Sequence, residues 1–309
     1  MKGIHIIATG RALPKNILDN DALSRMVETN DEWIRTRTGI GQRHICEEET
    51  CVSLAVDAAK KAVEKAAMKQ TFNKEEIGAV VVATVTPDYV FPSVACMIQK
   101  ELGLSEDIIA FDISAACSGF LYGLEICRNL LITQEKKYAL LIGSEQMSKL
   151  VDYSDRSSCI LFGDGAGAAL IEARDSLYVQ KNWSRGDTEA LFCKDHIQMN
   201  GNKVFRFAVS VLKDSMGKVL EKANLTMEDI DCVVCHQANA RIIEHVRQKY
   251  PGHQHKFYMN IERYGNTSAA SVPIALDELL EAGILKEGMK VICTGFGAGF
   301  TWSCALFEV

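Results

Sequence analysis

Long apolar runs, an excess of basic residues and low-complexity tracts are all missing from this 309-residue sequence. Because no apolar run approaches the roughly 20 residues of a membrane-spanning helix, we expect no membrane span. The net charge of -6 and the pI near 5.7 give no support to nucleic-acid binding. A mean hydropathy of +0.01 and 24% charged residues are typical of a folded globular chain and argue against disorder.

A secretion signal and a disulfide framework are not expected either. Residues 1–8 are too short for the apolar region of a signal peptide and run into a glycine-containing turn. We therefore expect a cytoplasmic protein. The 11 cysteines are an odd number in a chain that is not small, which is unlike a disulfide-stapled secreted domain. Some of these thiols should fill the core, and one is a candidate for a reactive group.

What the sequence does contain is an alternation of strand-like and helix-like segments. Residues 78–86 and 138–143 are apolar and strand-like, while residues 52–67 and 117–131 are helix-like. This alternation predicts α/β layers with largely parallel strands. The length alone suggests two units of about 150 residues each.

The second half of the chain repeats the order of the first. Residues 230–236 match residues 77–83 at an offset of 153, and residues 289–295 match residues 137–143 at an offset of 152. A near-constant offset indicates a duplicated α/β unit. We expect an N-terminal half at 1–172 and a C-terminal half at 173–309, with a cleft where their helix N-termini meet.

Cys117 follows a predicted strand in the segment Phe111-Asp-Ile-Ser-Ala-Ala-Cys-Ser-Gly-Phe120. Small residues on both sides of the cysteine permit a sharp turn from strand to helix, as in the elbows that present catalytic nucleophiles. A helix N-terminus favours the thiolate and lowers the thiol pKa. From this segment alone, Cys117 is either a nucleophile or a small buried apolar residue.

A second candidate is the segment Cys232-Val-Val-Cys-His-Gln-Ala-Asn239. Its Cys-x-x-Cys-His pattern also occurs at c-type haem attachment sites, but here it lies mid-chain in a strand-like run. A zinc site needs a second pair of ligands, and a redox Cys-x-x-Cys usually begins a helix. His236 then stands at the end of a strand, as either a structural or a functional hydrogen-bonding residue.

A third candidate is the segment Tyr264-Gly-Asn-Thr-Ser-Ala-Ala-Ser271, which precedes a predicted helix. Asn266 or Thr267 is a good helix N-cap, and an asparagine held in a cleft also donates hydrogen bonds to a developing oxyanion. The glycine motifs at 163–167 and 295–299 lack the spacing of a dinucleotide-binding loop. We expect them to form tight turns between strands.

The chain closely resembles the β-ketoacyl-[acyl-carrier-protein] synthase III family, the condensing enzymes that start type II fatty acid synthesis. Nearly the whole chain is involved. The motifs that carry the resemblance are Asp31-Glu-Trp-Ile-Arg-Thr-Arg-Thr-Gly39, Ala115-Ala-Cys-Ser-Gly119, Phe162-Gly-Asp-Gly-Ala-Gly167, His236-Gln-Ala-Asn239, Gly265-Asn-Thr-Ser-Ala-Ala-Ser271 and Gly297-Ala-Gly-Phe-Thr-Trp302. The resemblance implies the thiolase fold, in which two related α/β halves stack in five αβαβα layers, usually in a homodimer.

The resemblance also implies the chemistry. Cys117 takes an acyl group from acyl-CoA, and the backbone N–H groups of Cys117 and Ala298 form its oxyanion hole. The family often has glycine where this chain has Ala298, a change that keeps the backbone donor. Malonyl-[acyl-carrier protein] then loses CO2, and His236 and Asn266 stabilise the enolate. The ping-pong reaction yields 3-oxoacyl-[acyl-carrier protein] and CoA without a metal or a cofactor.

Binding residues are implied in the same way. Trp33 and Arg156 match the pair that encloses the adenine of CoA, since an indole face and a guanidinium plane suit that role. The full set of CoA-binding candidates is Thr29, Trp33, Arg37, Arg156 and Asn202. Phe91 matches a residue that crosses the homodimer interface toward the acyl pocket of the partner.

Acyl carrier protein is acidic and so is this chain, so a local basic patch is needed for docking. Candidates for this patch are Arg206, Arg241, His245 and Lys249. The last three are spaced by four residues and are expected on one face of the helix after His236.

Two alternatives remain open. Residues 184–200 form a shorter stretch than is usual in the family at the wall of the acyl pocket, which leaves the primer open among acetyl, branched and longer acyl groups. A related synthase of specialised metabolism, with a different primer or acceptor, is therefore the first alternative. A haem or redox protein that uses Cys232 and Cys235 is the second.

Overall fold

The computed structural model describes residues 2–69 and 71–309. Met1, the first residue of the N-terminal segment examined for a signal peptide, lies outside the described residues. The segment after it forms the long strand β1 (Lys2–Ala12), which is mostly buried. No helix of the described ranges is both long and apolar enough to cross a membrane.

Two mixed five-stranded sheets share one strand order. The first sheet has the order β5-β4-β6-β7-β1 and the second has the order β12-β11-β13-β14-β8. In each sheet the first three strands are parallel to one another, the fourth is antiparallel to the third, and the fifth is antiparallel to the fourth. The remaining strands are β4 (Ile77–Ala83), β5 (Ile109–Ile113), β6 (Tyr138–Glu145), β7 (Gly165–Asp175), β8 (Tyr178–Ser184), β11 (Cys232–Cys235), β12 (Phe257–Tyr258), β13 (Lys290–Gly297) and β14 (Thr301–Glu308).

The predicted duplication is therefore a duplication of topology, and the expectation of parallel strands holds for the central part of each sheet. The chain passes from the first sheet to the second between Asp175 and Tyr178. The expected boundary between residues 172 and 173 falls within β7, near its end, and remains a prediction.

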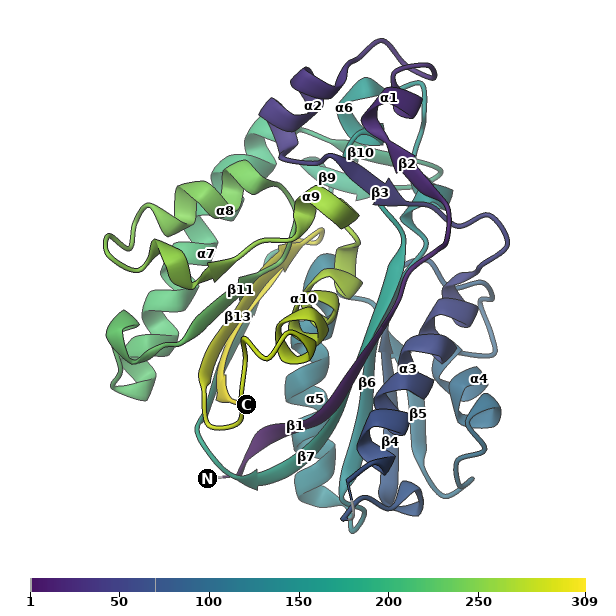
Figure 1. The fold of residues 1–309 in the computed structure, drawn as a ribbon, viewed down its shortest axis with the longest axis vertical. Coiled ribbons are helices and arrows are strands. Elements are labelled where there is room, and N and C mark those ends of the chain that lie inside the picture. The colour runs from purple at the N-terminus through teal and green to yellow at the C-terminus, as the bar shows by residue number, and fades with distance from the viewer. Residues whose placement is uncertain (1, 70) are drawn as a thin grey trace.

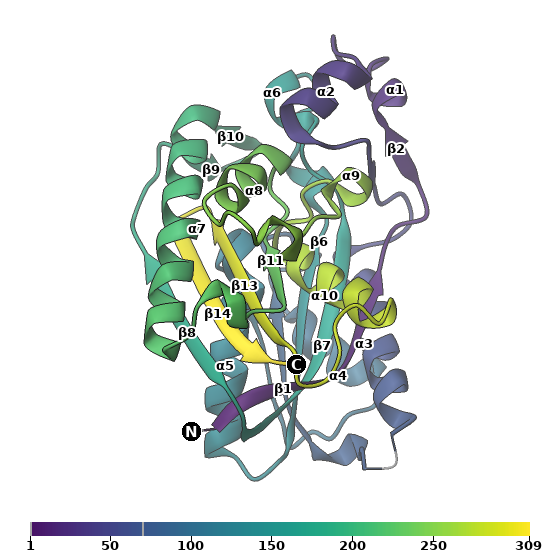
Figure 2. The same ribbon diagram turned by 60° about the vertical axis from the view of Figure 1, so that its left-hand side comes forward.

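Helices cover and separate the two sheets, which gives the expected five layers (Figures 1 and 2). In Figure 1 the layers follow one another from α7 and α8 on the left to α3 and α4 on the right. The central layer consists of α5 and α10, which pack against both sheets. The helices are α3 (Cys51–Ala67), α4 (Val94–Glu101), α5 (Gly119–Thr133), α7 (Gly201–Ala223), α8 (Ala240–Arg247) and α10 (Ser271–Glu281).

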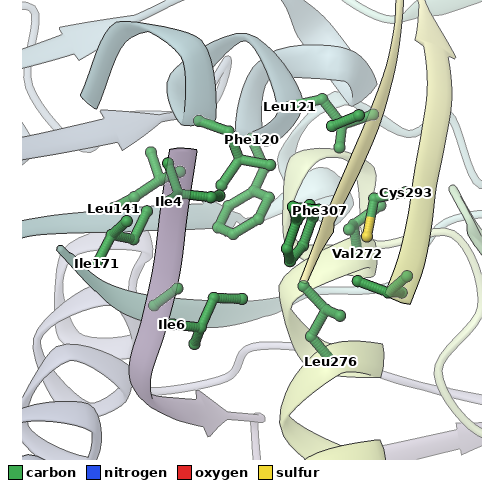
Figure 3. Close-up of a cluster of buried hydrophobic side chains, with 14 of the residues drawn as sticks. Ile4, Ile6, Phe120, Leu121, Leu141, Ile171, Val272, Leu276, Cys293 and Phe307 are labelled. Carbon is green, nitrogen blue, oxygen red and sulfur yellow. The ribbon is translucent and has the colours of Figure 1, made fainter. Parts of the chain in front are cut away.

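Strand β4 explains why the central strands are apolar throughout. Ala79 and Val81 face the central layer, whereas Val80 and Val82 face the outer helices. Because successive side chains of a strand point to opposite faces, a sheet covered on both sides needs apolar residues at every position. Figure 3 shows the central cluster, in which side chains of α5 and α10 meet those of both sheets.

Shorter elements lie together beyond one end of the two sheets. They are β2 (Ile17–Asp19), α1 (Asn20–Leu23), α2 (Asp31–Thr38), β3 (Gln42–His44), α6 (Arg156–Cys159), β9 (Leu191–Cys193), β10 (Ile197–Met199) and α9 (Ile261–Tyr264). Single 3-10 turns complete the chain: η1 (Lys74–Glu76), η2 (Ala116–Ser118), η3 (Met147–Leu150), η4 (Met227–Asp229), η5 (Gln254–Lys256) and η6 (Ser268–Ala270). Two of these turns, η2 and η6, lead into the central helices α5 and α10.

Candidate active site

The predicted strand-to-helix elbow is present at Cys117. Strand β5 ends at Ile113, the turn η2 carries Cys117, and α5 begins at Gly119. Ala116 has a φ of 46°, a left-handed conformation that residues other than glycine rarely adopt. Gly297 of β13 lies so close to the backbone N–H of Cys117 that a Cβ atom there would approach the nitrogen to 2.7 Å. Glycine at 297 therefore permits the end of β13 to lie against the nucleophile turn.

The thiol pKa differs from the sequence-based expectation. Cys117 is partly accessible at the bottom of a cavity, but the surrounding protein removes most of the water from its thiol. This burial raises the pKa of the Cys117 thiol to about 12, and the nearby carboxyl of Glu145 raises it further, while the Ser268 hydroxyl acts in the opposite direction. Burial thus favours the protonated thiol, where a helix N-terminus alone would favour the thiolate.

Asn266 is oriented by the second turn of the pair. Its Oδ1 accepts a hydrogen bond from the backbone N–H of Ser268 at 2.9 Å, which leaves the amide Nδ2 as the donor available to the cavity. Helix α10 begins at Ser271 and has Ala270 as its N-cap, without a capping side chain. The prediction that Asn266 or Thr267 caps this helix is therefore wrong, because η6 comes between them and the helix.

His236 follows directly after β11, and its backbone N–H donates to the carbonyl of Thr294 at 2.7 Å. Its Nδ1 lies 2.6 Å from the hydroxyl of Ser271, at the start of α10. The edge of the Phe296 ring packs near the imidazole, at 5.8 Å between ring centroids. Burial lowers the pKa of His236 to about 3, so the imidazole is neutral at physiological pH. A neutral imidazole that holds its proton on Nε2 is a hydrogen-bond donor without a charge.

These three side chains line one cavity of about 460 Å³. Cys117, His236 and Asn266 come from different segments of the chain and meet where the two halves face each other. Four predicted binding residues line the same cavity: Trp33, Arg37, Asn202 and Arg241. The structure therefore brings together the catalytic candidates and part of the predicted CoA site.

A second cavity of about 370 Å³ lies on another side of Cys117 and is lined by Ala298 and Ser268 as well. Its far wall includes Leu191, Phe192 and Ile197 from β9 and β10, the region that the sequence indicated as the wall of the acyl pocket. The hydroxyl of Thr301 contacts the carbonyls of Ala115 and Ala298 at 3.0 and 3.2 Å. This hydroxyl ties the turn that holds Ala298 to the turn that holds Cys117.

At the mouth of the first cavity, the guanidinium of Arg156 stacks on Trp33 at 4.7 Å, and that of Arg37 lies 5.7 Å from the same ring. Arg156 also donates to the carbonyl of Glu28 at 3.1 Å. Thr29 and Arg156 do not belong to the lining of the cavity itself. The hydroxyl of Thr29 is buried and has no hydrogen-bond partner within the described ranges.

The basic patch is present but differs from its prediction. Arg241 and His245 are exposed on α8, and both contact the ring of Phe205 on α7. Arg206 is exposed on α7 next to that ring. Helix α8 ends at Arg247, so Lys249 lies beyond it and does not extend the expected helix face. The sequence pattern overestimated the length of this helix.

Phe91 lies in the loop after β4 and is 83% exposed, and its neighbour Val90 is 96% exposed. It lines neither cavity next to Cys117. The contact of Phe91 with a partner's acyl pocket therefore remains a prediction. The exposure of these two apolar side chains is consistent with it.

Cys232 and Cys235 fill the core, which the sequence predicted for some of the thiols, and they do not form a haem or redox site. Cys232 and Cys235 are both buried in β11 but belong to different clusters, because Cys232 faces the central layer and Cys235 faces α7 and α8. Thiols on opposite faces of a sheet are unable to form one redox pair or one haem attachment site. No group of three or more His, Cys, Asp and Glu residues in the described ranges is placed to hold a metal ion.

The first glycine motif is part of a strand rather than a tight turn. Gly165 and Gly167 lie within β7, and a Cβ atom on Gly167 would approach the backbone of α10 to 2.7 Å. Of the second motif, Gly295 and Gly297 end β13, and only its last residues form the turn into β14. Both motifs permit close approach of a neighbouring segment.

Sequence reasoning did not single out Glu145, Ser268 or Ser271. Ser268 and Ser271 lie within the segment 264–271, but nothing in the sequence indicated that their hydroxyls contact Glu145 and His236. Glu145 did have one, because it is an acidic residue that closes an otherwise apolar strand.

Comparison with known proteins agrees with this geometry. The family model "3-Oxoacyl-[acyl-carrier-protein (ACP)] synthase III" matches residues 111–184, and its C-terminal counterpart matches residues 220–309. The β-ketoacyl-[acyl-carrier-protein] synthase III of Acholeplasma laidlawii is 47% identical, over 99% of this chain and 98% of that protein. The chain belongs to the 3-oxoacyl-[acyl-carrier-protein] synthase III family.

The synthase III structure from Aquifex aeolicus VF5 superposes with a TM-score of 0.94 at 42% identity, over 99% of this chain and 100% of that one. A priming β-ketosynthase of the R1128 polyketide pathway superposes with a TM-score of 0.92 at 32% identity, over 99% of this chain and 96% of that one. The thiolase fold and the assignment to the acyltransferase class of condensing enzymes are thereby confirmed for this synthase III chain.

Proposed function

We propose that this chain catalyses the initiating condensation of type II fatty acid synthesis. It transfers an acyl group from acyl-CoA to Cys117 and condenses it with malonyl-[acyl-carrier protein], releasing CO2, CoA and 3-oxoacyl-[acyl-carrier protein]. The observation that carries the proposal is the meeting of Cys117, His236 and Asn266 at one cavity, in a member of the synthase III family.

In the first half-reaction the sulfur of Cys117 attacks the thioester carbonyl of acyl-CoA. The carbonyl oxygen becomes an oxyanion that the backbone N–H groups of Cys117 and Ala298 stabilise. The close packing of Gly297 on the Cys117 turn and the contacts of Thr301 support this arrangement, because they hold both turns in place. Preorganised donors of this kind contribute roughly 3 to 4 kcal/mol each to such reactions.

In the second half-reaction CO2 leaves the malonyl group, so the carbanion forms without removal of a proton. Its negative charge spreads onto the thioester oxygen as an enolate. His236 and Asn266 donate hydrogen bonds to that oxygen. Neutral donors suit the step, and the lowered pKa of His236 keeps its imidazole in the neutral form. The enolate then attacks the acyl-Cys117 thioester, and the thiolate of Cys117 leaves.

CoA and the carrier protein are proposed to bind at two different sets of residues. We place CoA along Thr29, Trp33, Arg37, Arg156 and Asn202, with its adenine between Trp33 and Arg156. Since Arg156 stacks directly on Trp33, it has to swing outward when the adenine binds. An acidic carrier protein would dock on Arg206, Arg241, His245 and Lys249.

The proposal also includes a homodimer, through the exposed loop around Phe91, and a cytoplasmic location, where acyl-CoA and carrier protein are available. The chemistry requires no cofactor, because decarboxylation supplies the carbanion and Cys117 supplies the covalent intermediate.

The central experiment separates the two half-reactions. Purified protein is incubated with acetyl-CoA and its intact mass is measured, which should show an acetyl group on Cys117. The H236A variant should still be acetylated but should lose most decarboxylation of malonyl-[acyl-carrier protein]. A wild-type protein that no acyl-CoA acylates at Cys117, or an H236A protein with normal decarboxylation, would contradict the proposal.

A synthase of specialised metabolism with another primer is the second candidate. It is favoured by the cavity of about 370 Å³ beside Cys117, which is larger than an acetyl group needs, and by the similarity to a priming β-ketosynthase. A panel of acetyl-, isobutyryl- and hexanoyl-CoA in the acylation assay decides between them, since a clear preference for acetyl-CoA argues against this candidate.

A further inference from the structure

Glu145 is a buried acidic side chain next to the nucleophile that the mechanism above does not use. It ends β6 and is 0% exposed. No lysine, arginine or histidine in residues 2–69 or 71–309 forms an ion pair with it. A buried carboxylate without a cationic partner is costly to maintain, and this cost is a reason to look for a function.

Neutral donors surround the Glu145 carboxyl. Its Oε2 accepts from the hydroxyl of Thr86 at 2.7 Å, from the backbone N–H of Val85 at 3.0 Å and from the hydroxyl of Thr84 at 3.3 Å. Its Oε1 accepts from the hydroxyl of Ser268 at 2.9 Å. Three donors therefore hold one oxygen in place, while the other oxygen depends on Ser268 alone among these contacts.

Ser268 connects this carboxyl to the nucleophile. It lies in η6, which packs against the η2 turn, and both Ser268 and Cys117 line the cavity of about 370 Å³. The Ser268 hydroxyl also acts to lower the pKa of the Cys117 thiol. One hydroxyl thus lies between a buried carboxyl and the sulfur that has to lose a proton.

The donors and acceptors fit a chain with one direction. A hydroxyl has one proton to donate and two lone pairs to accept with. Since the proton of Ser268 points to Glu145, its oxygen presents a lone pair to other donors. A protonated thiol at Cys117 would be such a donor, so the order that a relay requires is Cys117 S–H to Ser268 O–H to Glu145 carboxylate.

We propose that Ser268 and Glu145 relay the thiol proton of Cys117 during acylation, with Glu145 as its acceptor. This proposal rests on Cys117 as the nucleophile of the proposed function. The S–H bond breaks as its proton moves to Ser268 Oγ, and the original Ser268 proton moves to Glu145 Oε1. The sulfur lone pair attacks the acyl carbonyl, and the departing CoA thiolate takes up the proton that Glu145 held. The balance is thiol plus acyl-CoA to acyl-Cys117 plus CoA.

The relay avoids the formation of a second buried charge. Before the transfer the negative charge lies on Glu145, and after it the charge lies on the sulfur of Cys117. The net charge of the site stays the same, and the repulsion that Glu145 exerts on a thiolate disappears once the carboxyl is protonated. Two other titratable groups lie nearby. The first is Cys51 of α3, whose pKa is raised by burial and by the charges of Glu145 and Asp88, and the second is His236, which lines the first cavity.

The E145Q variant distinguishes a relay from a purely electrostatic effect. If Glu145 acts only through its charge, its removal lowers the thiol pKa and acylation becomes faster. If Glu145 accepts the proton, E145Q acylates more slowly, by on the order of 10²-fold at pH 7. In that case the deficit shrinks as the pH rises from 7 to 9.5, because hydroxide then forms the thiolate directly.

Acylation is measured in single turnovers with acetyl-CoA by quenching and intact-protein mass. The S268A variant interrupts the relay but retains Glu145, and it should be slowed comparably. Alanine is suited to this position, since Ala116 has a φ of 46° in the paired turn and Ser268 has 49°. The C51A variant removes the other nearby thiol without interrupting the relay and should acylate at the wild-type rate.

Several results would overturn the relay. These are E145Q or S268A enzymes that acylate as fast as the wild type, or a deficit that stays constant with pH. An equal loss in decarboxylation of malonyl-[acyl-carrier protein] by acylated variants would indicate a structural role and also overturn it. A wild-type enzyme that is not acylated at Cys117 contradicts the proposed function instead, which keeps the two failures distinguishable.

Discussion

The turns η2 and η6 share a left-handed residue but carry different side chains. Ala116 in the first half and Ser268 in the second are 152 residues apart and have φ values of 46° and 49°. Each turn leads into a helix of the central layer. The next residue is Cys117 in one turn and Ala269 in the other, and Ala269 is 1% exposed. The duplication therefore provided two such turns, and only the one in the first half has a cysteine at this position.

The same comparison applies to the residues around the turns. His236 stands where the first half has Ala83, and Ser271 stands where it has Gly119. Glu145 stands where the second half has Gly297. Each half thus contributes different side chains on one scaffold: Cys117 and Glu145 come from the first half, and His236 and Asn266 from the second.

The largest effect is expected when the nucleophile is moved to the other turn. The C117A variant should lose condensation by about 10⁴-fold or more, since a covalent step has no substitute. Adding A269C should not restore activity, because Ala269 lines neither cavity beside Cys117. The assay is CoA release with malonyl-[acyl-carrier protein], and activity of the double variant would show that the two turns are equivalent.

A smaller effect is expected from Ser271→Ala. The imidazole of His236 then loses the hydroxyl 2.6 Å from its Nδ1, and with it the fixed position of the Nε2 proton. Decarboxylation by the acylated enzyme should fall roughly 10- to 100-fold, while acylation of Cys117 stays near the wild-type rate. Ser215→Ala removes a buried hydroxyl that contacts Thr294 instead, and it serves as the control. Equal losses in the two variants would speak against this role of Ser271.

The two halves also each bury a neutral histidine, which predicts how stability depends on pH. Burial lowers the pKa of His5 to about 4 and that of His236 to about 3. In the unfolded chain both histidines have a pKa near 6.5. Between that pH and the lower pKa values of the folded state, the unfolded chain binds more protons than the folded chain. The folded chain therefore loses stability as the pH falls below about 6.5.

His5→Asn should reduce that pH dependence by up to about 1.4 kcal/mol per pH unit without loss of activity. Urea unfolding at pH 5 and pH 7 measures the difference. An unchanged difference in the variant would show that His5 does not titrate on unfolding.

An effect on stability alone is expected from exchanging a strand residue for its counterpart. Cys235 of β11 corresponds to Val82 of β4, and both are fully buried. Cys235→Val should lower the free energy of unfolding by about 1 to 3 kcal/mol and leave catalysis intact, because valine stays apolar but adds a methyl-sized branch to a packed core. Loss of activity with wild-type stability would instead assign a chemical role to this thiol.

The fold was predictable from the sequence because its signals are periodic. Continuous apolar strands such as residues 77–83 and the repeat offset indicated covered sheets and a duplication. The elbow at Cys117 was predictable because small residues flank it. Where the prediction failed, at the length of the helix before Lys249, the pattern continued past the point at which the structure ends the helix.

The candidate site was predictable only as a set of residue types. Local sequence indicates a helix N-terminus at Cys117 and a lowered thiol pKa, but burial in the folded protein raises this pKa. Glu145 and Ser268 are 123 residues apart, so their hydrogen bond is a consequence of tertiary packing and has no local signal. The same holds for the contact between His236 and Ser271.

The position of Gly297 and Thr301 near the end of the chain has a consequence for biosynthesis. The ribosome makes the turn that carries Cys117 well before the strand pair β13–β14 that packs against it. A nascent chain therefore carries Cys117 for most of its synthesis without the groups that would let it attack a thioester. Under the proposed function, Cys117 would therefore gain its oxyanion hole only after the strand pair β13–β14 has been made.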